Sequence, residues 1–299
     1  MSRESRWFGA VEAGGTKFVC AIGDASGALR SETRIPTTDP PATLGKVREF
    51  LQGSGAPLSA IGLACFGPVE LDRRSANYGF IGKTPKSGWS HIDMVGALAR
   101  EFSCPVGFDT DVTGAALAEQ RWGAGRGTRN LVYLTVGTGI GGGVLVEGVP
   151  VHGLMHPEIG HIHPRRNALD GDFAGVCPFH GDCLEGLASG PAILARTGSE
   201  LQHLHASHAQ WDLQADYLGQ LCAQLVLTVS PQRIIMGGGV MQQQRLFPLL
   251  RARMLHWLGG YIGRSEILSD VDRYVVPAAL GARAGVLGAL SLAIGAAAP

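Results

Sequence analysis

The sequence predicts an α/β protein, and three observations lead to that fold class. Apolar runs typical of strands alternate along the chain with segments typical of helices, an order that favours mixed α/β architectures. A strand, a glycine turn and a second strand follow one another twice, over 7–22 and over 131–146, as expected of an internal duplication. Hydrophobic residues make up 45% of the chain and its 44 glycines have no three-residue period. A packed core is therefore expected, and a collagen-like chain is excluded.

The first half of the chain is expected to begin with a hairpin, because two short apolar runs flank a glycine turn. Further apolar runs predict strands, whereas prolines at the start of one segment and alanines throughout another favour helices. In order, the expected elements are a strand at 7–12, a turn at 13–17, a strand at 18–22, a turn at 24–27, a helix at 40–52, a strand at 61–66, a helix at 91–102, a strand at 106–108 and a helix at 112–120.

The second half repeats the opening pattern and then adds helices of its own. Residues 150–190 show few regular patterns but hold many His, Cys, Asp and Glu residues, which makes them a candidate site. In order, the expected elements are a strand at 131–136, a glycine turn at 137–143, a strand at 144–146, a helix at 211–229, a strand at 233–236, a glycine loop at 237–239, a helix at 242–258 and a helix of small residues at 281–294.

The charge balance and the ends of the chain limit the classes of function. Lys and Arg number 25 and Asp and Glu number 25, so the net charge is zero, which argues against a nucleic-acid partner. The first seven residues lack the apolar run of a signal peptide, and the longest uncharged stretch, 284–299, is too short to span a bilayer. A cytoplasmic protein without a membrane partner is expected. Its isolated cysteines are then small core residues, namely Cys20, Cys65, Cys104 and Cys222.

Three glycine loops mark the segments expected to bind a nucleotide. They are Gly14-Gly15-Thr16-Lys17, Gly137-Thr138-Gly139 with the glycines that follow, and Gly237-Gly238-Gly239. Glycine allows positive φ and brings backbone N–H groups close to phosphate oxygens; plain hairpin turns are the alternative. The second loop leads into a strand rather than a helix, so it is not the dinucleotide fingerprint, and the first lacks the earlier glycine of a P-loop. Lys17 is either a fixed cation near phosphate or an exposed strand lysine.

Two aspartates at the junction of an expected strand and helix are the candidates for acid–base chemistry. In Asp109-Thr110-Asp111 the carboxylates follow the strand 106–108 and precede the helix 112–120. A carboxylate at this place can accept the proton of a hydroxyl that attacks a phosphoryl group. The alternative is that either aspartate serves only as a helix N-cap.

The segment from Cys177 through His180 to Cys183 has the spacing of metal ligands. Thiolate and imidazole donors together favour tetrahedral Zn²⁺, and free thiols are the alternative. A fourth ligand has to come from elsewhere in the chain, and spacing does not choose among the upstream histidines. These are His152, His156, His161 and His163.

Together these motifs resemble the ROK family of sugar kinases, and within it most resemble bacterial zinc-containing fructokinases. The resemblance is carried by 12–17, 135–142, 235–239, 156–161 and 177–186. It implies the two-lobed actin/hexokinase/Hsp70-like ATPase fold, which is ribonuclease H-like, with ATP between the lobes. It also implies a small lobe of residues 1–111, on which a C-terminal helix at 282–299 packs, and a larger lobe of residues 112–281 with an inserted zinc loop.

The resemblance implies a catalytic residue and a set of sugar ligands. Asp111 matches the third position of the family's triplet and would be the general base. The hexose would be bound by Thr110, Glu158, His161 and Glu185. Thr110 and Thr113 stand where many ROK kinases have Asn, so the sugar contacts at these two positions are left open. Solvated surface acids are the alternative for Glu158 and Glu185.

The resemblance also assigns the nucleotide and metal ligands. The three glycine loops and Pro191, in a segment expected to be a loop, would border ATP. Zinc would be held by His161, Cys177, His180 and Cys183. Four protein ligands leave no open position, so the zinc would be structural. His161 would bind zinc through one ring nitrogen and the sugar through the other, and the metal would fix its orientation.

The activity that the resemblance implies is ATP-dependent phosphorylation of D-fructose to fructose 6-phosphate, with Mg²⁺ held mostly by phosphates and water. Glucokinase, mannokinase and N-acetylmannosamine kinase are alternatives, because the shared hydroxyl contacts fit several hexoses. A repressor of the family would need an N-terminal helix-turn-helix, and the strand expected near Trp7 leaves no room for one. Asp111 and the phosphate loops argue against a non-catalytic sugar-binding regulator. The expected partners are hexose, ATP and a second copy in a homodimer.

Overall fold

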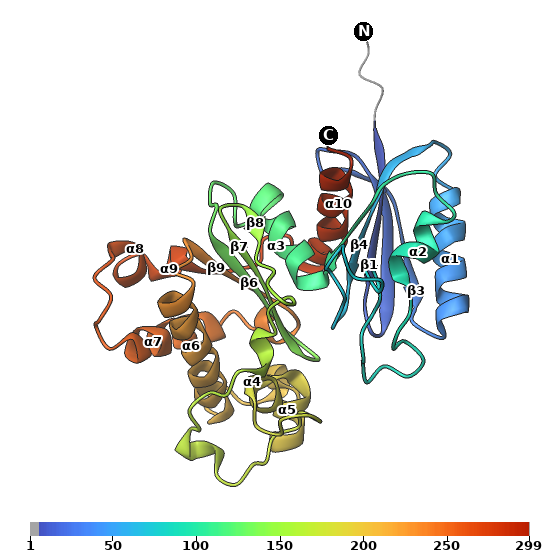
Figure 1. The fold of residues 1–299 in the computed structure, drawn as a ribbon. Coiled ribbons are helices and arrows are strands. Elements are labelled where there is room, and N and C mark those ends of the chain that lie inside the picture. The colour runs from blue at the N-terminus through green and yellow to red at the C-terminus, as the bar shows by residue number, and fades with distance from the viewer. Residues whose placement is uncertain (1–5, 299) are drawn as a thin grey trace. The chain divides into compact units, whose positions relative to one another are not determined.

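The computed structural model describes residues 6–298, so most of the N-terminal stretch considered for a signal peptide lies outside the described residues. The chain divides into two compact units, whose elements are labelled in Figure 1. Unit 1 comprises the chain up to Gly123, Pro150–His156 and the chain from Ala282 onward, and unit 2 comprises Ala124–Val149 and Pro157–Gly281. Among the described residues, each unit has a five-stranded sheet and a hydrophobic core.

The sheet of unit 1 has the strand order β3-β2-β1-β4-β5. β1 (Trp7–Ala13) pairs antiparallel with β2 (Lys17–Gly23), which pairs antiparallel with β3 (Leu29–Pro36). β4 (Leu58–Cys65) is parallel to β1, and β5 (Val106–Thr110) is parallel to β4. The predicted hairpin is confirmed. β3 was not predicted, because its mostly exposed and often charged residues give no apolar run.

The described helices of unit 1 are α1 (Pro40–Gln52), α2 (Met94–Ala99), α3 (Asp111–Trp122) and α10 (Ala284–Ala296). α1 has the predicted bounds, and the Asp39 side chain caps it by accepting from the Ala42 N–H. α2 is shorter than predicted because His91 has a positive φ and Asp93 is the N-cap. α3 belongs to unit 1, whereas the sequence placed residues 112–120 in the larger lobe.

α10 lies directly on the backbone of the unit 1 sheet, because the facing residues have no side chains. A Cβ at Gly62 of β4 would collide with the carbonyl of Ala289, and one at Gly107 of β5 would collide with the carbonyl of Leu292. Gly288 of α10 meets α3 backbone to backbone. The C-terminal helix is thus part of the core that holds β1, β4 and β5 in place.

The sheet of unit 2 has the order β10-β9-β6-β7-β8. Its strands are β6 (Leu131–Val136), β7 (Ile140–Val146), β8 (Val149–Pro150), β9 (Arg233–Gly237) and β10 (Val275–Pro277). β6 pairs antiparallel with β7 and parallel with β9, and β9 is parallel to β10. Unit 1 has the same arrangement: β1 is antiparallel to β2 and parallel to β4, and β4 is parallel to β5. The two sheets therefore share a topology, as the repeated strand–glycine–strand pattern predicts.

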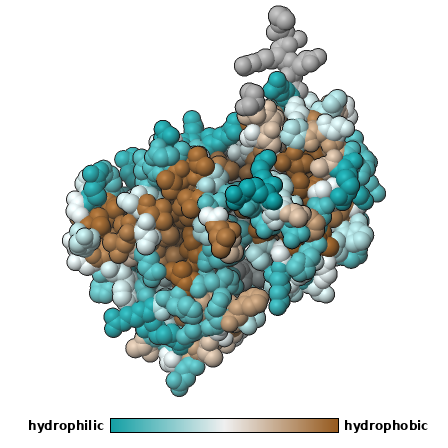
Figure 2. Space-filling model, viewed as in Figure 1, coloured by the Kyte–Doolittle hydropathy of each residue, from teal (hydrophilic) through white to brown (hydrophobic). Residues whose placement is uncertain are grey.

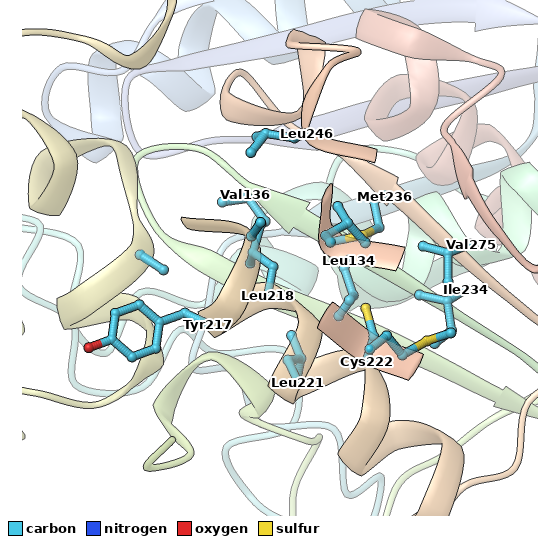
Figure 3. Packing of buried hydrophobic residues seen from close by; sticks show 14 of the residues in the cluster. Leu134, Val136, Tyr217, Leu218, Leu221, Cys222, Ile234, Met236, Leu246 and Val275 are labelled. Atoms are coloured by element: carbon cyan, nitrogen blue, oxygen red, sulfur yellow. The ribbon is translucent and has the colours of Figure 1, made fainter. Parts of the chain in front are cut away.

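The core of unit 2 lies between its sheet and two long helices, α6 (Gln210–Thr228) and α7 (Leu246–Leu258). Figure 3 shows side chains of α6, among them Leu218 and Cys222, beside Leu134 of β6 and Ile234 of β9. The connections contain the short helices α4 (Leu184–Ala188), α5 (Gly190–Thr197), α8 (Ser265–Leu268) and α9 (Val271–Tyr274) and the 3-10 turns η1 (Ile159–His161) and η4 (Val240–Gln242). Across residues 6–298, none of the helices has the length and apolarity needed to span a membrane.

Two segments of unit 2 differ from the sequence prediction. Gly141–Gly143 lie inside β7 rather than in the turn, because their backbone groups pair with β6 without any help from side chains. Ser189 and the two residues that follow start α5 rather than form a loop. The Ser189 hydroxyl accepts from the Ala192 N–H, and proline is well tolerated in the first helical turn. Pro191 therefore stands at a helix N-terminus.

Candidate active site

The turn between β1 and β2 holds the first glycine motif. Gly14 donates its N–H to the carbonyl of Lys17 at 3.1 Å, and the Gly14 carbonyl accepts from the Thr37 hydroxyl at 2.7 Å. A Cβ at Gly14 would lie 2.7 Å from the Lys17 carbonyl oxygen, so the turn requires glycine there. A Cβ at Gly15 would meet nothing within 4 Å, and Thr16 and Lys17 are exposed. The tip of the turn is open to a ligand.

The Asp109-Thr110-Asp111 triplet joins β5 to α3, as predicted. Thr110 is the N-cap of α3: its hydroxyl oxygen accepts from the Thr113 N–H at 3.1 Å and donates to the Thr113 hydroxyl at 2.8 Å. Thr110 is buried, and its contact with a sugar stays a prediction. Asp111 is half-buried at the first position of the helix, where its carboxylate accepts from the Val112 N–H at 2.9 Å.

A second carboxyl group, not predicted from the sequence, lies near Asp111. Glu12 of β1 pairs in register with Ala64 of β4, which pairs with Asp109 of β5, so the three side chains are on one face of the sheet. Burial and the nearby Asp111 raise the pKa of Glu12 from its ordinary 4.5 to about 7. The signal in the sequence is an acid near the end of an apolar strand, just before a glycine turn.

His152, one of the histidines considered as a fourth zinc ligand, lies instead beside the Asp109-Thr110-Asp111 triplet. Its Nε2 lies 3.2 Å and 3.1 Å from the two carboxylate oxygens of Asp109, which is buried. The Asp109 carboxylate also accepts from the Thr110 N–H at 2.7 Å. The hydrogen bond to Asp109 raises the pKa of His152 above its ordinary value. Asp109 is therefore held by a histidine beside the candidate base, rather than acting as the N-cap.

The second and third glycine loops lie side by side in unit 2. A Cβ on Gly137 would be 3.7 Å from the amide nitrogen of Gly239, and the Gly137 carbonyl accepts from the Gly190 N–H at 2.7 Å. Gly238 has φ +92° and faces the backbone of Val136, so it cannot carry a side chain. Gly237 lies inside β9 rather than in the loop. The structure thus brings the loops 137–139 and 237–239 to the start of α5, where Pro191 lies.

The Glu185 side chain reaches the same loop from α4. Its Oε2 accepts from the Ile140 N–H at 2.9 Å, and a Cβ on Gly139 would lie 2.6 Å from that oxygen. Glu185 is half-buried and follows closely after Cys183. One candidate sugar ligand is therefore in direct contact with the candidate phosphate loop.

The four predicted metal ligands come together in unit 2. The ligand atoms of His161, Cys177, His180 and Cys183 all lie within 4.8 Å of one another. His161 Nδ1 is 3.4 Å from Cys183 Sγ and 3.8 Å from Cys177 Sγ, and Cys177 Sγ is 3.7 Å from His180 Nδ1. Zinc bonds of about 2.0–2.3 Å place tetrahedral donors about 3.4–3.8 Å apart. The observed separations therefore fit a tetrahedral zinc site.

Of the four upstream histidines considered as the fourth metal ligand, the structure places His161 in the cluster. His161, in η1, joins the cluster, and the carbonyl of Glu158 accepts the His161 N–H at 3.0 Å. His156 accepts from the Val69 N–H at 3.1 Å, and His152 contacts Asp109. His163 Nδ1 lies 3.8 Å from Asp182. The exposed Glu158 thus shares one turn with the predicted fourth ligand.

Comparison with known proteins covers nearly the whole chain. The ROK family matches residues 8–296. The fructokinase of Zymomonas mobilis is 42% identical over 302 residues, which cover 99% of each chain. The fructokinase of Pediococcus pentosaceus is 41% identical over 286 residues, 95% of this chain and 96% of its own. The glucokinase of Halalkalibacterium halodurans is 31% identical over 275 residues, 79% of this chain and 81% of its own.

A solved structure agrees with these sequence matches. The ROK hexokinase of Thermus thermophilus matches with a TM-score of 0.78 at 27% identity, over 96% of this chain and 98% of that chain. Only a small share of either chain lies outside this match.

Proposed function

The chain belongs to the ROK family, and on that premise we propose that it is a fructokinase that transfers the γ-phosphoryl group of ATP to O6 of D-fructose. Its fold is the actin/hexokinase-like ATPase fold of that family. The observation that carries the proposal is its identity with fructokinases over nearly the full length of both chains, which is higher than its identity with the glucokinase.

Asp111 is the general base of the proposed reaction. Its carboxylate takes the proton of the 6-hydroxyl as that oxygen bonds to the γ-phosphorus. The bond between the γ-phosphorus and the β,γ-bridging oxygen breaks at the same time, and ADP leaves with the electron pair. Glu12 keeps its proton up to about pH 7, so below that pH it adds no negative charge beside Asp111.

The glycine loops supply the proposed nucleotide site. The backbone at Gly14-Gly15 and Gly137–Gly139 binds the phosphates, with Thr16, Lys17 and Thr138 beside them, and the loop 237–239 with Pro191 borders the adenosine. This assignment is supported by the contacts among the loops and α5 in unit 2 and by the open tip of the β1–β2 turn. Mg²⁺ is held mainly by the phosphates and water, and it neutralises charge on the transferred group.

The proposed sugar ligands are carboxylates and a histidine held by short elements. Glu158 and His161 share the η1 turn, and Glu185 lies in α4. Carboxylates accept strong hydrogen bonds from sugar hydroxyls. The zinc proposed for the Cys/His cluster has four protein ligands, so it holds His161 in place and takes no part in phosphoryl transfer.

A coupled ADP-release assay with fructose, glucose, mannose and N-acetylmannosamine tests the proposal. We expect fructose to have the highest kcat/KM. In Asp111→Asn, kcat falls about 10²–10⁴-fold, while the affinity for fructose, measured by calorimetry, changes little. Asp212→Asn is the matched control, because Asp212 is an exposed aspartate in the first turn of α6 and lies outside the site. Equal turnover by the wild type and Asp111→Asn would overturn the role of the base, and activity with glucose alone would overturn the preference for fructose.

A homodimer in the cytoplasm is also proposed for this chain. Hydrophobic residues reach the surface over the β6–β7 part of unit 2 in Figure 2, and Val146 and Val149, at the end of β7 and in β8, are 42% and 64% exposed. Exposed apolar surface of this kind is typical of contact surfaces. Sedimentation equilibrium checks the mass: a monomer at micromolar concentration would contradict the dimer.

A further inference from the structure

Glu185 is a proposed sugar ligand whose side chain also contacts the proposed phosphate loop. Its Oε2 accepts from the Ile140 N–H at 2.9 Å, directly after the phosphate loop 137–139. A carboxylate has two oxygens with about four acceptor positions in total, so Oε1 remains for hydroxyl groups of a sugar. The Glu185 side chain is therefore shared between the sugar site and the phosphate loop.

The backbone around Ile140 leaves little freedom to loosen this contact. Gly160, next to His161 in η1, approaches the Ile140 carbonyl so closely that a Cβ on Gly160 would collide with it. At the other end of the loop, the Gly137 carbonyl accepts from the Gly190 N–H at 2.7 Å. The loop is thus held against η1, α4 and α5. A change at Glu185 therefore alters the loop as well.

The negative charge of Glu185 determines how this contact affects the binding of nucleotide. A phosphate bound by the loop places negative charge close to a half-buried carboxylate, and like charges in such surroundings repel strongly. Sugar hydroxyls that donate to the carboxylate offset part of its negative potential. Without sugar, the charge of Glu185 therefore opposes the binding of nucleotide. When sugar hydroxyls donate to Glu185, this opposition is weaker.

We propose that the Glu185 carboxylate, through its hydrogen bond to the Ile140 N–H, couples the binding of hexose and nucleotide, so that each ligand binds more tightly when the other is present. The inference rests on the proposed function of the site. Coupling between two ligands is reciprocal. ATP consequently binds weakly until the sugar is in place, which limits the transfer of phosphate to water.

Calorimetric titration of AMP-PNP with Mg²⁺, with and without saturating fructose, tests the coupling. In the wild type, fructose tightens the binding of AMP-PNP about 5-fold or more. Glu185→Gln keeps an oxygen that accepts from the Ile140 N–H but removes the charge. In this variant AMP-PNP binds about 5-fold more tightly without fructose, and fructose changes its affinity less than about 2-fold. A residue that only bound sugar would leave the fructose-free affinity for AMP-PNP unchanged.

Glu147→Gln is the matched control for the charge. Glu147 follows β7 at the opposite end from Ile140, is exposed, and its carboxylate contacts Arg129 and Asn130. The substitution removes one negative charge from unit 2, yet it should keep the coupling of the wild type. Loss of coupling in this control as well would overturn the assignment to Glu185.

A pair of loop variants tests the same contact from the other side. In Gly139→Ala the new Cβ would lie 2.6 Å from Glu185 Oε2 and must displace the carboxylate, whereas in Gly137→Ala the nearest atom is 3.7 Å away. Gly139→Ala should weaken the binding of fructose in the absence of nucleotide about 5-fold or more, and Gly137→Ala should weaken it much less. Equal effects of the two variants on fructose would overturn the inference.

The outcomes separate the inference from the proposed function. A wild type that binds neither fructose nor AMP-PNP overturns both. If the wild type binds and turns over both ligands while Glu185→Gln keeps the wild-type coupling, the fructokinase assignment stands and the coupling role of Glu185 is wrong. Equal thermal unfolding temperatures of the wild type and Glu185→Gln confirm that the comparison is made on folded protein.

Discussion

Glu12 is a half-buried carboxyl group whose surroundings favour its protonated form. Its side chain packs against the first turn of α10 so closely that a Cβ at Gly285 would collide with it. A helix N-terminus favours a negative charge, but burial and the repulsion from Asp111 outweigh Lys17 and Arg34 and raise the pKa of Glu12 to about 7. At the pH of the cell, part of the protein carries a neutral Glu12.

The raised pKa of Glu12 makes the stability of the protein depend on pH. The folded chain keeps this proton up to about pH 7, whereas the unfolded chain loses it near 4.5. Stability is therefore lost as the pH rises from about 4.5 through 7, and a shift of this size corresponds to about 3 kcal/mol. Glu12→Gln, which cannot ionise, should match the wild type at pH 5 and be more stable by about 1–3 kcal/mol at pH 8.5. Urea unfolding at both pH values measures this, and an equal difference at both would contradict the raised pKa.

The side chains that lie together could be predicted from the sequence where a motif carries them. The zinc ligand spacing and the family pattern together identify His161, which the structure places in the cluster. The contact between His152 and Asp109 spans 43 residues and depends on the return of Pro150–His156 to unit 1. A contact of this kind has no local pattern, so it could not be predicted.

Backbone hydrogen bonds close the loop that carries two cysteines and a histidine of the cluster. Cys177 donates its N–H to the Gly181 carbonyl at 3.2 Å, and Gly181 donates to the Cys177 carbonyl at 2.9 Å. His161 comes from η1, so a bound zinc ties that turn to the loop. Loss of the metal should therefore release His161 from its orientation.

Removal of one thiolate tests the zinc at the level of the loop. Purified wild type should contain about one zinc per chain, and Cys183→Ser should lose most of it, with a fructose affinity that falls about 10-fold or more. Cys104→Ser is the control, because Cys104 is partly exposed and lies outside the cluster. Elemental analysis and calorimetry measure the two quantities. A zinc-free Cys183→Ser that binds fructose as tightly as the wild type would show that the metal does not orient His161.

The packing of α10 against α3 depends on glycine at one place and not at another. In Gly288→Ala the new Cβ would collide with the backbone of Gly114, and the overpacking should destabilise the protein by about 1–3 kcal/mol. In Gly295→Ala, in the same helix, the Cβ meets nothing within 4 Å, so the better helix propensity of alanine should stabilise by about 0.5–1 kcal/mol. Urea unfolding midpoints at an unchanged m value measure both. Shifts of the same sign would argue against close helix contact.

Elements with a regular apolar pattern could be predicted, and the others could not. α1 has the predicted bounds because its buried positions follow the helical period. β6 has them because it is a continuous apolar run, buried along nearly its whole length. β3 is an exposed edge strand and β10 has three residues, so neither has a distinct pattern. α5 starts with Gly-Pro, which is typical of a loop, and only the hydroxyl cap of Ser189 indicates a helix.

On the scale of the whole molecule, unit 1 is assembled from three separate parts of the chain. Its sheet is built before residue 124, but the helix that covers β1, β4 and β5 comes from the last part of the chain. Unit 2 is nearly continuous from Ala124 to Gly281, apart from 150–156. The sheet of unit 1 therefore cannot bury its glycine-lined face until the C-terminal segment is present.

Truncation after Gly281 should affect the two units differently. Without α10, Gly62 and Gly107 leave the backbone of β4 and β5 open to water, and Glu12 loses the helix that buries it. Amides of β1 and β4 should then exchange with deuterium at least about 10-fold faster, whereas amides of α6, buried in unit 2, should keep their protection. Truncation after Ala296, which leaves α10 whole, is the control. Since Asp111 directly follows β5 of this sheet, the shorter chain should also lose fructose phosphorylation. Wild-type protection of β1 and β4 would show that the sheet is stable without its last helix.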